Sequence, residues 1–351
     1  MSLAVVTGSS GLVGSETVKF LAEQGLEVVG IDNNLRRYFF GPDGSTERRT
    51  GELQRTLRGF THHDLDIRDE CRISGLFGRL GRATSLVVHA AAQPSHDWAA
   101  REPLTDFSVN ADGTLVLLDA ARRHCPEAVF VLLSTNKVYG DTPNRLPLVE
   151  QQLRWELDVA HPFSPHGIDE SMSIDCSMHS LFGASKLSAD ILTQEYGRYF
   201  GMRTGTFRCG CVTGPAHAAV EQHGFLAYLV KCALSGRTYT IFGHKGKQVR
   251  DNIHARDLVR ALWQFFLAPR SAAVYNMGGS RHSNCSILEA IGKIEALCGR
   301  RVQTALGEAR AGDHVWYISD VRRFRKDYPD WAHAYDLDRI LAELTEAARA
   351  V

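Results

Sequence analysis

The sequence has no excess of charge, no long hydrophobic run and no paired cysteine motif, and each absence excludes a class of protein. Lys and Arg together number 40, as do Asp and Glu, so we expect neither nucleic acid nor an anionic membrane surface as a partner. No apolar run approaches the roughly 18 residues that a membrane-spanning helix needs. The short apolar run of residues 3–6 lacks a basic leader, so we expect no signal peptide. The eight cysteines form no Cys-x-x-Cys pair, which argues against a metal site and favours reduced thiols in a cytoplasmic protein.

The 351 residues, 44% of them hydrophobic, suffice for a large α/β domain with a smaller lobe attached. In the first half, short β-rich runs alternate with helical stretches, which indicates a parallel sheet covered on both faces. We expect strands at Leu3–Thr7, Glu27–Asp32, Leu86–Ala90, Val129–Ser134 and Arg203–Arg208. We expect helices at Val13–Gln24, Asp106–His124 and Gly183–Phe200, and in the C-terminal lobe at Leu288–Leu297 and Leu337–Ala350. The predicted fold class is therefore α/β, a doubly wound parallel sheet of the Rossmann type with a smaller C-terminal lobe.

Two polar segments interrupt this alternation. Asn33–Phe60 contains Gly-Pro-Asp-Gly and several arginines, and we expect a loop with no more than one helix. Asn144–Ser180 is rich in Pro, His and Asp and follows the end of a strand. Loops of this length in a compact domain are usually binding segments or lids, so we expect Asn144–Ser180 to be functional.

A glycine-rich turn lies directly between the first predicted strand and the first predicted helix. Gly8, Gly11 and Gly14 let the backbone turn tightly and approach a pyrophosphate, whose charge then lies at the helix N-terminus. Asp32 ends the second strand, where a carboxylate accepts hydrogen bonds from both hydroxyls of an adenosine ribose and repels a 2′-phosphate. We therefore predict NAD as the cofactor. Arg36 and Arg37 follow closely and leave NADP as the alternative.

The Gly-x-x-Gly-x-x-Gly spacing, together with several later motifs in the right order, resembles the extended short-chain dehydrogenase/reductase family of sugar-nucleotide enzymes. The resemblance implies an adenine-binding pair after the third strand, a cofactor-lining run after the fourth, and a helix asparagine that supports a catalytic lysine. The cofactor-binding residues that it implies are Gly8, Gly11, Leu12, Val13, Gly14, Asp32, Asn33, Asp66, Ile67, Ala90, Ala91, Ala92, Gln93, Asn110 and Lys186. We accordingly expect residues 1–210, with a returning segment near 250–275, to bind NAD, and residues 211–249 and 276–351 to bind a nucleotide sugar.

The chemistry of the family depends on a Ser or Thr and a Tyr-x-x-x-Lys motif, whose tyrosine removes a sugar hydroxyl proton. Here Thr135 and Lys186 match, but Phe182 stands where the tyrosine is expected. A phenyl ring carries no ionisable proton. Either another group takes the role, or Thr135 and ordered water relay the proton, or the protein binds NAD and ligand without turnover. The candidates for a replacement base are His179, His96, Asp97 and Cys211, with histidine favoured because its pKa lies near neutrality.

For Tyr139 we expect a structural role beside the strand end.

The resemblance also implies a nucleotide-sugar substrate. Two arginines resemble family positions that contact nucleotide phosphates, and planar guanidinium groups suit that task. The implied substrate-binding residues are Thr135, Asn136, Lys137, Cys211, Arg250, Arg310 and Asp313. The run Ser134–Asp141 is closest to the branch that inverts C2 of a CDP-linked hexose through a transient keto sugar.

Other activities remain as alternatives to this epimerisation. The 4,6-dehydratases of the family carry Asp-Glu where Asn136-Lys137 stands here, and the decarboxylases usually carry glutamate in place of Asn136. A 4-epimerase and a non-catalytic NAD-binding sensor also stay open. The resemblance finally implies a homodimer formed through the Asp106–His124 and Gly183–Phe200 helices, for which an apolar stripe at Leu187, Ile191 and Leu192 is suitable.

Overall fold

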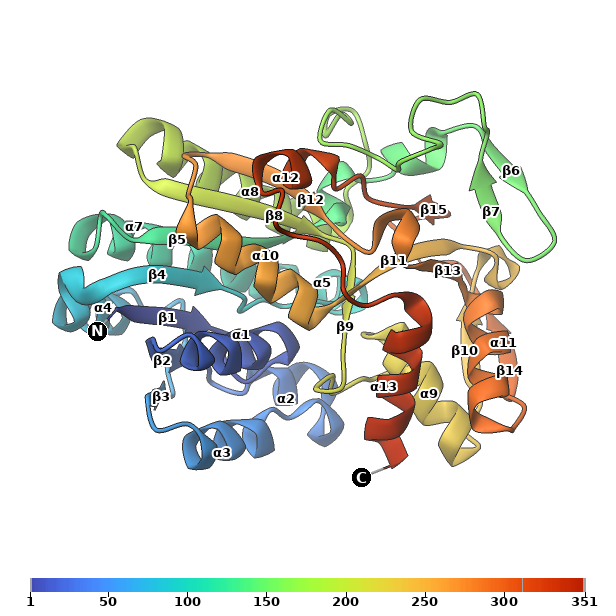
Figure 1. Ribbon diagram of the computed structural model, residues 1–351, viewed down its shortest axis with the longest axis horizontal. Coiled ribbons are helices and arrows are strands. Elements are labelled where there is room, and N and C mark those ends of the chain that lie inside the picture. The colour runs from blue at the N-terminus through green and yellow to red at the C-terminus, as the bar shows by residue number, and fades with distance from the viewer. Residues whose placement is uncertain (1, 311, 350–351) are drawn as a thin grey trace. The chain divides into compact units, whose positions relative to one another are not determined.

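The computed structural model (Figure 1) describes residues 2–310 and 312–349 and divides into two compact units. The first unit comprises Met1–Val138, Leu181–Arg208 and Val259–Tyr275. The second comprises Tyr139–Ser180, Cys209–Leu258 and Asn276–Val351. Within the described ranges, no helix combines the length and the apolar character needed to cross a bilayer.

A seven-stranded sheet forms the centre of the first unit. Its order is β12-β8-β5-β4-β1-β2-β3, and β1 pairs in parallel with both β2 and β4. The strands span β1 (Leu3–Thr7), β2 (Glu27–Ile31), β3 (Phe60–His63), β4 (Thr84–His89), β5 (Val129–Thr135), β8 (Arg203–Cys209) and β12 (Ala273–Met277). In chain order this is the doubly wound arrangement, with its topological reversal between β1 and β4. The predicted fold class is confirmed, and the five predicted strands are present within one or two residues of their ends.

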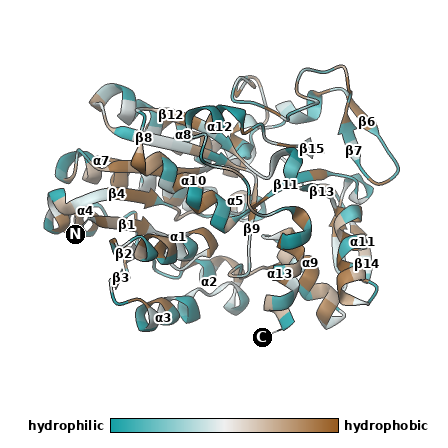
Figure 2. Ribbon diagram, viewed as in Figure 1, coloured by the Kyte–Doolittle hydropathy of each residue, from teal (hydrophilic) through white to brown (hydrophobic). Residues whose placement is uncertain are grey.

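Helices cover both faces of this sheet. On one face α4 (Glu70–Leu80), α7 (Gly113–His124) and α8 (Ser180–Phe200) contribute to a buried apolar cluster with the strands. On the other face lie α1 (Leu12–Glu23) and α10 (Ala255–Leu267), which meet through the rings of Phe20 and Trp263, 6.0 Å between centroids. Because the central strands are buried from both sides, β1 and β5 are apolar along most of their length, as Figure 2 shows for β1.

Two sequence expectations in the first unit were wrong in detail. The predicted helix Asp106–His124 is divided into α6 (Pro103–Phe107), a π-helical turn at Ser108–Asp112, and α7. The predicted loop Asn33–Phe60 contains two α-helices, α2 (Leu35–Phe40) and α3 (Glu47–Thr56). Helix α3 has one buried residue, Leu53, and is hydrophilic elsewhere (Figure 2). The sequence there lacks the periodic apolar residues from which an amphipathic helix is predicted.

The second unit has a helical core and three small sheets. Helices α9 (Phe225–Ser235), α11 (Ile287–Cys298) and α13 (Leu337–Arg349) share one apolar cluster, to which the parallel pair β10 (Tyr239–Phe242) and β14 (Thr304–Gly307) contributes through Tyr239 and Ile241. A further sheet is built around β11 (Val249–His254), which pairs with β9 (Cys211–Thr213), β13 (Asn284–Ser286) and β15 (Trp316–Tyr317). The second unit also contains a hairpin, β6 (Leu148–Glu150) with β7 (Trp155–Leu157), and the short helix α12 (Arg322–Asp327).

The boundaries of the units differ from those expected at residues 1–210 and 250–275. Tyr139–Ser180 belongs to the second unit, and the returning segment of the first unit begins at Val259. The reason is a set of hydrogen bonds that no local pattern reveals: the Tyr139 hydroxyl donates to Asn276, 2.8 Å, and the Asn144 amide donates to the carbonyl of Asp313, 2.9 Å. The hydrogen-bonded ring of Tyr139 is fully buried, in agreement with the structural role expected for it.

Candidate active site

The glycine turn after β1 is packed so closely that Gly8 and Gly14 leave no room for a side chain. Gly8 has φ +64°, and a Cβ there would lie 2.7 Å from the main-chain nitrogen of Ala91 in the loop after β4. A Cβ on Gly14 would lie 1.9 Å from the carbonyl oxygen of Gly8. Gly11 is the N-cap of α1 and supplies no side-chain cap. The uncapped N–H groups at the start of this 12-residue helix therefore suit a phosphate anion, as expected for a dinucleotide.

Asp32 is held at the edge of the glycine turn by main-chain donors. Its carboxylate accepts from the N–H of Ser10, 3.0 Å, and from the N–H of Asn34, 2.8 Å. Arg36 donates to the carbonyl of Gly44, and burial lowers the pKa of Arg36 to about 10 despite the opposing charge of Asp32. Arg37 is exposed and lies 3.8 Å from Glu47. Since each arginine has a partner of its own, the geometry favours the carboxylate of Asp32 as the group that selects NAD.

The pair expected at the adenine end lies after β3. The Asn33 amide donates to Asp66, 3.3 Å, so these two predicted residues are brought together. The Arg68 guanidinium also binds Asp66, 2.6 Å, and its hydrogen bond lowers the pKa of that carboxyl. Ile67 is buried, and a Cβ on Gly113 would lie 2.7 Å from its Cδ1 atom. The Asp66 carboxylate is thus ionised and fixed in direction.

A buried amide network joins the loop after β4 to α8. Asn110, within the π-helical turn, accepts from the N–H of Gln93, 2.9 Å, and donates to Asp106 and to the hydroxyl of Ser185, 3.0 and 3.1 Å. Ser185 in turn donates to the carbonyl of Phe182, 3.0 Å. Burial raises the pKa of Asp106. Through Ser185, Asn110 is therefore hydrogen-bonded to the turn of α8 that precedes Lys186.

Thr135 and Lys186 converge on the carboxyl end of β5. Lys186 is buried, 5% exposed, and its ammonium donates to the carbonyl of Leu133, 2.8 Å. The hydroxyl of Thr135, the last residue of β5, accepts from the N–H of Lys137 and donates to the side chain of Asn136, 3.2 and 3.4 Å. In a doubly wound sheet this edge is where ligands bind.

One buried charge cluster at the same edge was missed by the sequence analysis. The carboxylate of Asp190 on α8 accepts from both Nε and Nη2 of Arg208, each 3.0 Å, and from Ser134, 2.6 Å, and Gln194, 2.7 Å. Asp190 is 0% exposed. The signal that could have revealed it is an arginine at the end of an apolar strand and an aspartate one helical turn after Lys186.

Phe182 lies one turn before Lys186 on α8 and is buried, 7% exposed. Its ring meets the imidazole of His96 edge to face, with 4.9 Å between centroids and 62° between planes. Asp97 is exposed. His179 belongs to the second unit, where its Nδ1 pairs with the carbonyl of Ser177, 3.0 Å, and its Nε2 with the hydroxyl of the same residue, 3.4 Å. Of the expected replacement bases, His96 is the one seen in contact with Phe182.

In the second unit, the expected phosphate-binding residues form a group of their own. The Arg250 guanidinium lies 2.7 Å from the carboxylate of Asp313, and Arg250 is 8% exposed. Arg310 lies over the ring of Phe242, 3.8 Å from its centroid, and its carbonyl accepts from the N–H of Asp313. Cys211, half buried on β9, is paired with Asn252 of β11.

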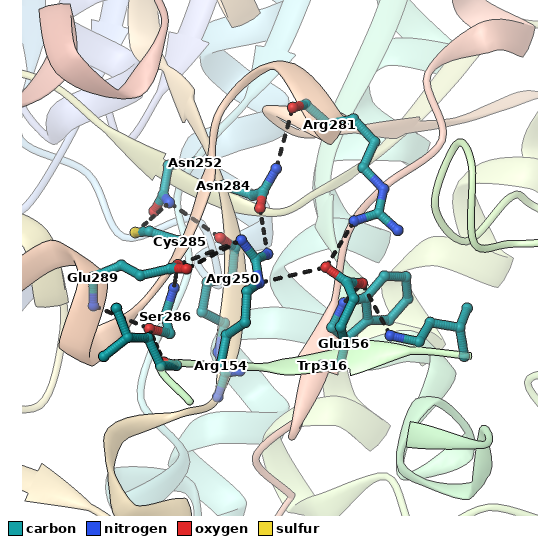
Figure 3. Close-up of polar contacts among 12 residues, drawn as sticks. Arg154, Glu156, Arg250, Asn252, Arg281, Asn284, Cys285, Ser286, Glu289 and Trp316 are labelled. Carbon is teal, nitrogen blue, oxygen red and sulfur yellow. Dashed lines mark hydrogen bonds and ion pairs between the residues drawn. The ribbon is translucent and has the colours of Figure 1, made fainter. Parts of the chain in front are cut away.

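A second ion-pair network of this unit was also missed. Figure 3 shows Arg154 between the carboxylates of Glu156 and Glu289, each 3.4 Å away. Glu156 also accepts from Arg281, 3.0 Å, and from the indole N–H of Trp316, 2.9 Å. The network ties the β6–β7 hairpin to β15, α11 and the segment before β13, so it organises the Asn144–Ser180 region expected to be functional.

Over residues 2–310 and 312–349, no group of three or more His, Cys, Asp or Glu side chains could hold a metal ion, and the eight cysteines are free thiols.

Comparison with known proteins gives one family. Residues 4–278 match the model of the NAD dependent epimerase/dehydratase family. The chain is 29% identical to a CDP-paratose 2-epimerase of Salmonella typhi over 338 residues, covering 93% of this chain and 94% of that protein. It is 26% identical to a dTDP-glucose 4,6-dehydratase of Shigella flexneri, covering 97% and 86%.

Among solved structures, the fold is similar to that of a UDP-glucuronic acid 4-epimerase from Bacillus cereus. The TM-score is 0.80 at 22% sequence identity, with 99% of both chains covered. The family match agrees with the glycine turn, Asp32 and the Thr135–Lys186 arrangement, and it confirms NAD as the expected cofactor. This chain belongs to the NAD dependent epimerase/dehydratase family, whose members in the comparisons act on sugar nucleotides.

Proposed function

We propose that the protein inverts C2 of a CDP-linked hexose through a transient keto sugar. The observation that carries the proposal is the end of β5, where Thr135 is followed by Asn136 and Lys137 and lies on the same strand as the carbonyl that binds Lys186. A 29% identity to a CDP-paratose 2-epimerase across almost the whole of both chains supports this branch over the others.

The first unit offers the groups that bind and orient the dinucleotide. The helix N-terminus after Gly11 binds the pyrophosphate, Asp32 the adenosine ribose, and Asp66 with Ile67 the adenine. Lys186 holds the nicotinamide ribose. NAD, when bound, supplies the acceptor and later the donor of a hydride.

We assign groups of each unit to a part of the sugar nucleotide. At the end of β5, the hydroxyl of Thr135 hydrogen-bonds the sugar oxygen that becomes a carbonyl, and Asn136 and Lys137 are assigned to the hexose, as is Cys211 of the second unit. Arg250 and Arg310 bind the diphosphate, with Asp313 orienting the Arg250 guanidinium, as the 2.7 Å ion pair suggests. Asn136 and Lys137 stand where a dehydratase carries its Asp-Glu pair, so the carboxyl pair used for elimination is missing, and inversion of one carbon through a keto sugar does not use that pair.

The protein is further proposed to act as a homodimer. Large apolar side chains are exposed on three helices of the first unit: Leu104 and Phe107 on α6, Leu115 on α7, and Ile191, Tyr199 and Phe200 on α8. A second copy of this chain would cover them. Leu192 of the expected stripe packs against the core instead, whereas Ile191 is 41% exposed. Sedimentation velocity should show a dimer that Ile191→Arg weakens.

The test of the proposed function uses the purified protein with CDP-, UDP- and GDP-linked hexoses. We expect a C2 isomer from a CDP-hexose without net change of the cofactor. A substrate deuterated at C2 should yield product that retains the deuterium, because the hydride returns to the carbon it left. A product that has lost one water molecule would instead identify a dehydratase, and one that has lost carbon dioxide would identify a decarboxylase. Bound NAD with no turnover would identify a binding protein.

A further inference from the structure

Phe182 on α8 stands at the position where the family carries its tyrosine. Phe182 is one helical turn before Lys186, so its ring occupies the volume that a tyrosine ring would fill. The ring is in direct contact with the imidazole of His96, 4.9 Å between centroids. The ionisable imidazole of His96 is thus in contact with the Phe182 ring, which carries no ionisable group.

His96 is also fixed in place by the network that fixes α8. It is the first residue of α5 (His96–Arg101), whose N-cap Ser95 accepts from the N–H of Trp98. The N–H of Ser95 donates to the side chain of Gln93, 2.6 Å. Gln93 is bonded to Asn110, which reaches Ser185 and, through its hydroxyl, the carbonyl of Phe182. Two independent connections, one direct and one through four hydrogen bonds, therefore set His96 against Phe182.

The other ionisable candidates lack this arrangement. The ring nitrogens of His179 are both engaged by Ser177. Asp97 is exposed, whereas the buried residues of α5 are Trp98 and Ala99. Imidazole is also the side chain whose ordinary pKa allows proton transfer in both directions near neutrality.

We propose that His96 is the acid–base residue of the reaction, in place of the tyrosine; this rests on the proposed function. The neutral imidazole takes the proton of the sugar C2 hydroxyl, the C2–H electron pair leaves as hydride to the bound oxidised dinucleotide, and C2 becomes a carbonyl. After the sugar reorients, the hydride returns to the other face of C2 and the imidazolium returns its proton to the oxygen. Atoms and electrons balance without a further reactant.

The test compares His96→Gln with His124→Gln, a matched variant in the same unit. His124 is the last residue of α7, and its ring hydrogen-bonds Ser74 of α4. His96→Gln should lower the single-turnover rate on CDP-hexose by at least about 100-fold, the usual contribution of a general base, while the affinity for NAD is unchanged. The acid limb of the rate–pH profile should disappear in this variant. His124→Gln should keep both the rate and the profile.

Phe182→Tyr supplies two readouts that do not depend on the folding of His96→Gln. A phenol beside the imidazole should shift the ¹⁵N signals of His96 in the cofactor-free protein and leave those of His124 unchanged. Because a base is already present, Phe182→Tyr alone should change the rate by less than about 10-fold, whereas in the double variant with His96→Gln it should restore part of the lost rate.

Each failure has a distinct meaning. A large gain of rate in Phe182→Tyr, or turnover by His96→Gln at the wild-type rate, would overturn the role proposed for His96 and leave the proposed function standing. Wild-type protein that holds NAD but converts no sugar nucleotide would overturn the proposed function and this role together.

Discussion

The two units prepare for their ligands by different means. In the first, main-chain N–H groups and fully buried side chains do most of the positioning: Gly8 and Gly14 by close packing, Asp32 by two backbone donors, Asp190 by four side-chain bonds. In the second, the expected ligand groups are long charged side chains paired with one another, such as Arg250 with Asp313. Backbone-built sites are rigid and leave motifs in the sequence, whereas charge pairs can be assembled from residues at any spacing.

The largest difference should appear when one member of a charge cluster is removed from each unit. Asp190→Ala leaves Arg208 charged and fully buried, which we expect to cost about 3–5 kcal/mol of unfolding free energy. Glu156→Ala leaves Arg154 with Glu289 as a second carboxylate, and should cost about 1–3 kcal/mol. Urea unfolding followed by circular dichroism measures both. Equal losses would contradict the contrast between the units.

Close packing of the glycine turn gives the next effect. Gly14→Ala should cost up to about 3 kcal/mol and abolish NAD binding, because the added methyl group meets the carbonyl of Gly8. Gly51→Ala, on α3 with open space around it, is the control and should be neutral or stabilising by about 1 kcal/mol. Thermal unfolding with and without NAD checks both variants; an alanine at 14 that binds NAD normally would show that the turn is not the phosphate site.

Asp32→Asn separates the choice of cofactor from the fold. The amide loses the charge that accepts from the ribose hydroxyls, so NAD affinity should fall by about 10- to 100-fold, or roughly 1.4–2.8 kcal/mol, with less loss for NADP. Isothermal titration with each dinucleotide gives the ratio. If the preference between the two were unchanged, Arg36 rather than Asp32 would be the selecting group.

A further effect concerns acid stability. Burial lowers the pKa of His89, in the first unit, to about 3, and that of His333, in the second, to about 4. Both lie below the value of about 6.5 of an unfolded histidine, so between these values the unfolded chain binds more protons and stability falls as the pH falls from about 6.5. Each group contributes up to about 1.4 kcal/mol per pH unit in that window.

We expect each of the variants His89→Gln and His333→Gln to lose less unfolding free energy between pH 6.5 and 4.5. Each substitution removes nearly one proton from the difference in proton binding between the unfolded and folded states, which sets the slope. The His89 variant tests a histidine bonded by Thr7 and Thr114, and the His333 variant one bonded by the carbonyl of Gly278. An unchanged slope in either would mean that the histidine is already charged in the folded protein.

The contrast between backbone-built sites and charge pairs also explains how far the sequence could be interpreted. Local patterns were enough for the doubly wound fold class, five of the strands of its sheet, the glycine turn and the position of Asp32, because strand, turn and helix are contiguous there. They were not enough for the Asp190–Arg208 pair, whose members are 18 residues apart, or for the Arg154 network, in which Glu289 is 135 residues from Arg154. The two helices within Asn33–Phe60 were hidden by their polarity, and the assignment of Tyr139–Ser180 to the second unit depends on bonds to Asn276 and Asp313.

The absence of tyrosine at 182 could be seen in the sequence, but its consequence could not. Four replacement bases were open on spacing alone, and only the packing of α5 against α8 brings one of them, His96, into contact with the phenyl ring. A contact between residues 86 positions apart has no local signature.

The central claim is that NAD binds across the glycine turn and Asp32. The most direct measurement is to strip the protein of any dinucleotide and titrate it with NAD and NADP by calorimetry. The account predicts saturation at one NAD per chain and weaker binding of NADP; a protein that binds neither would contradict it.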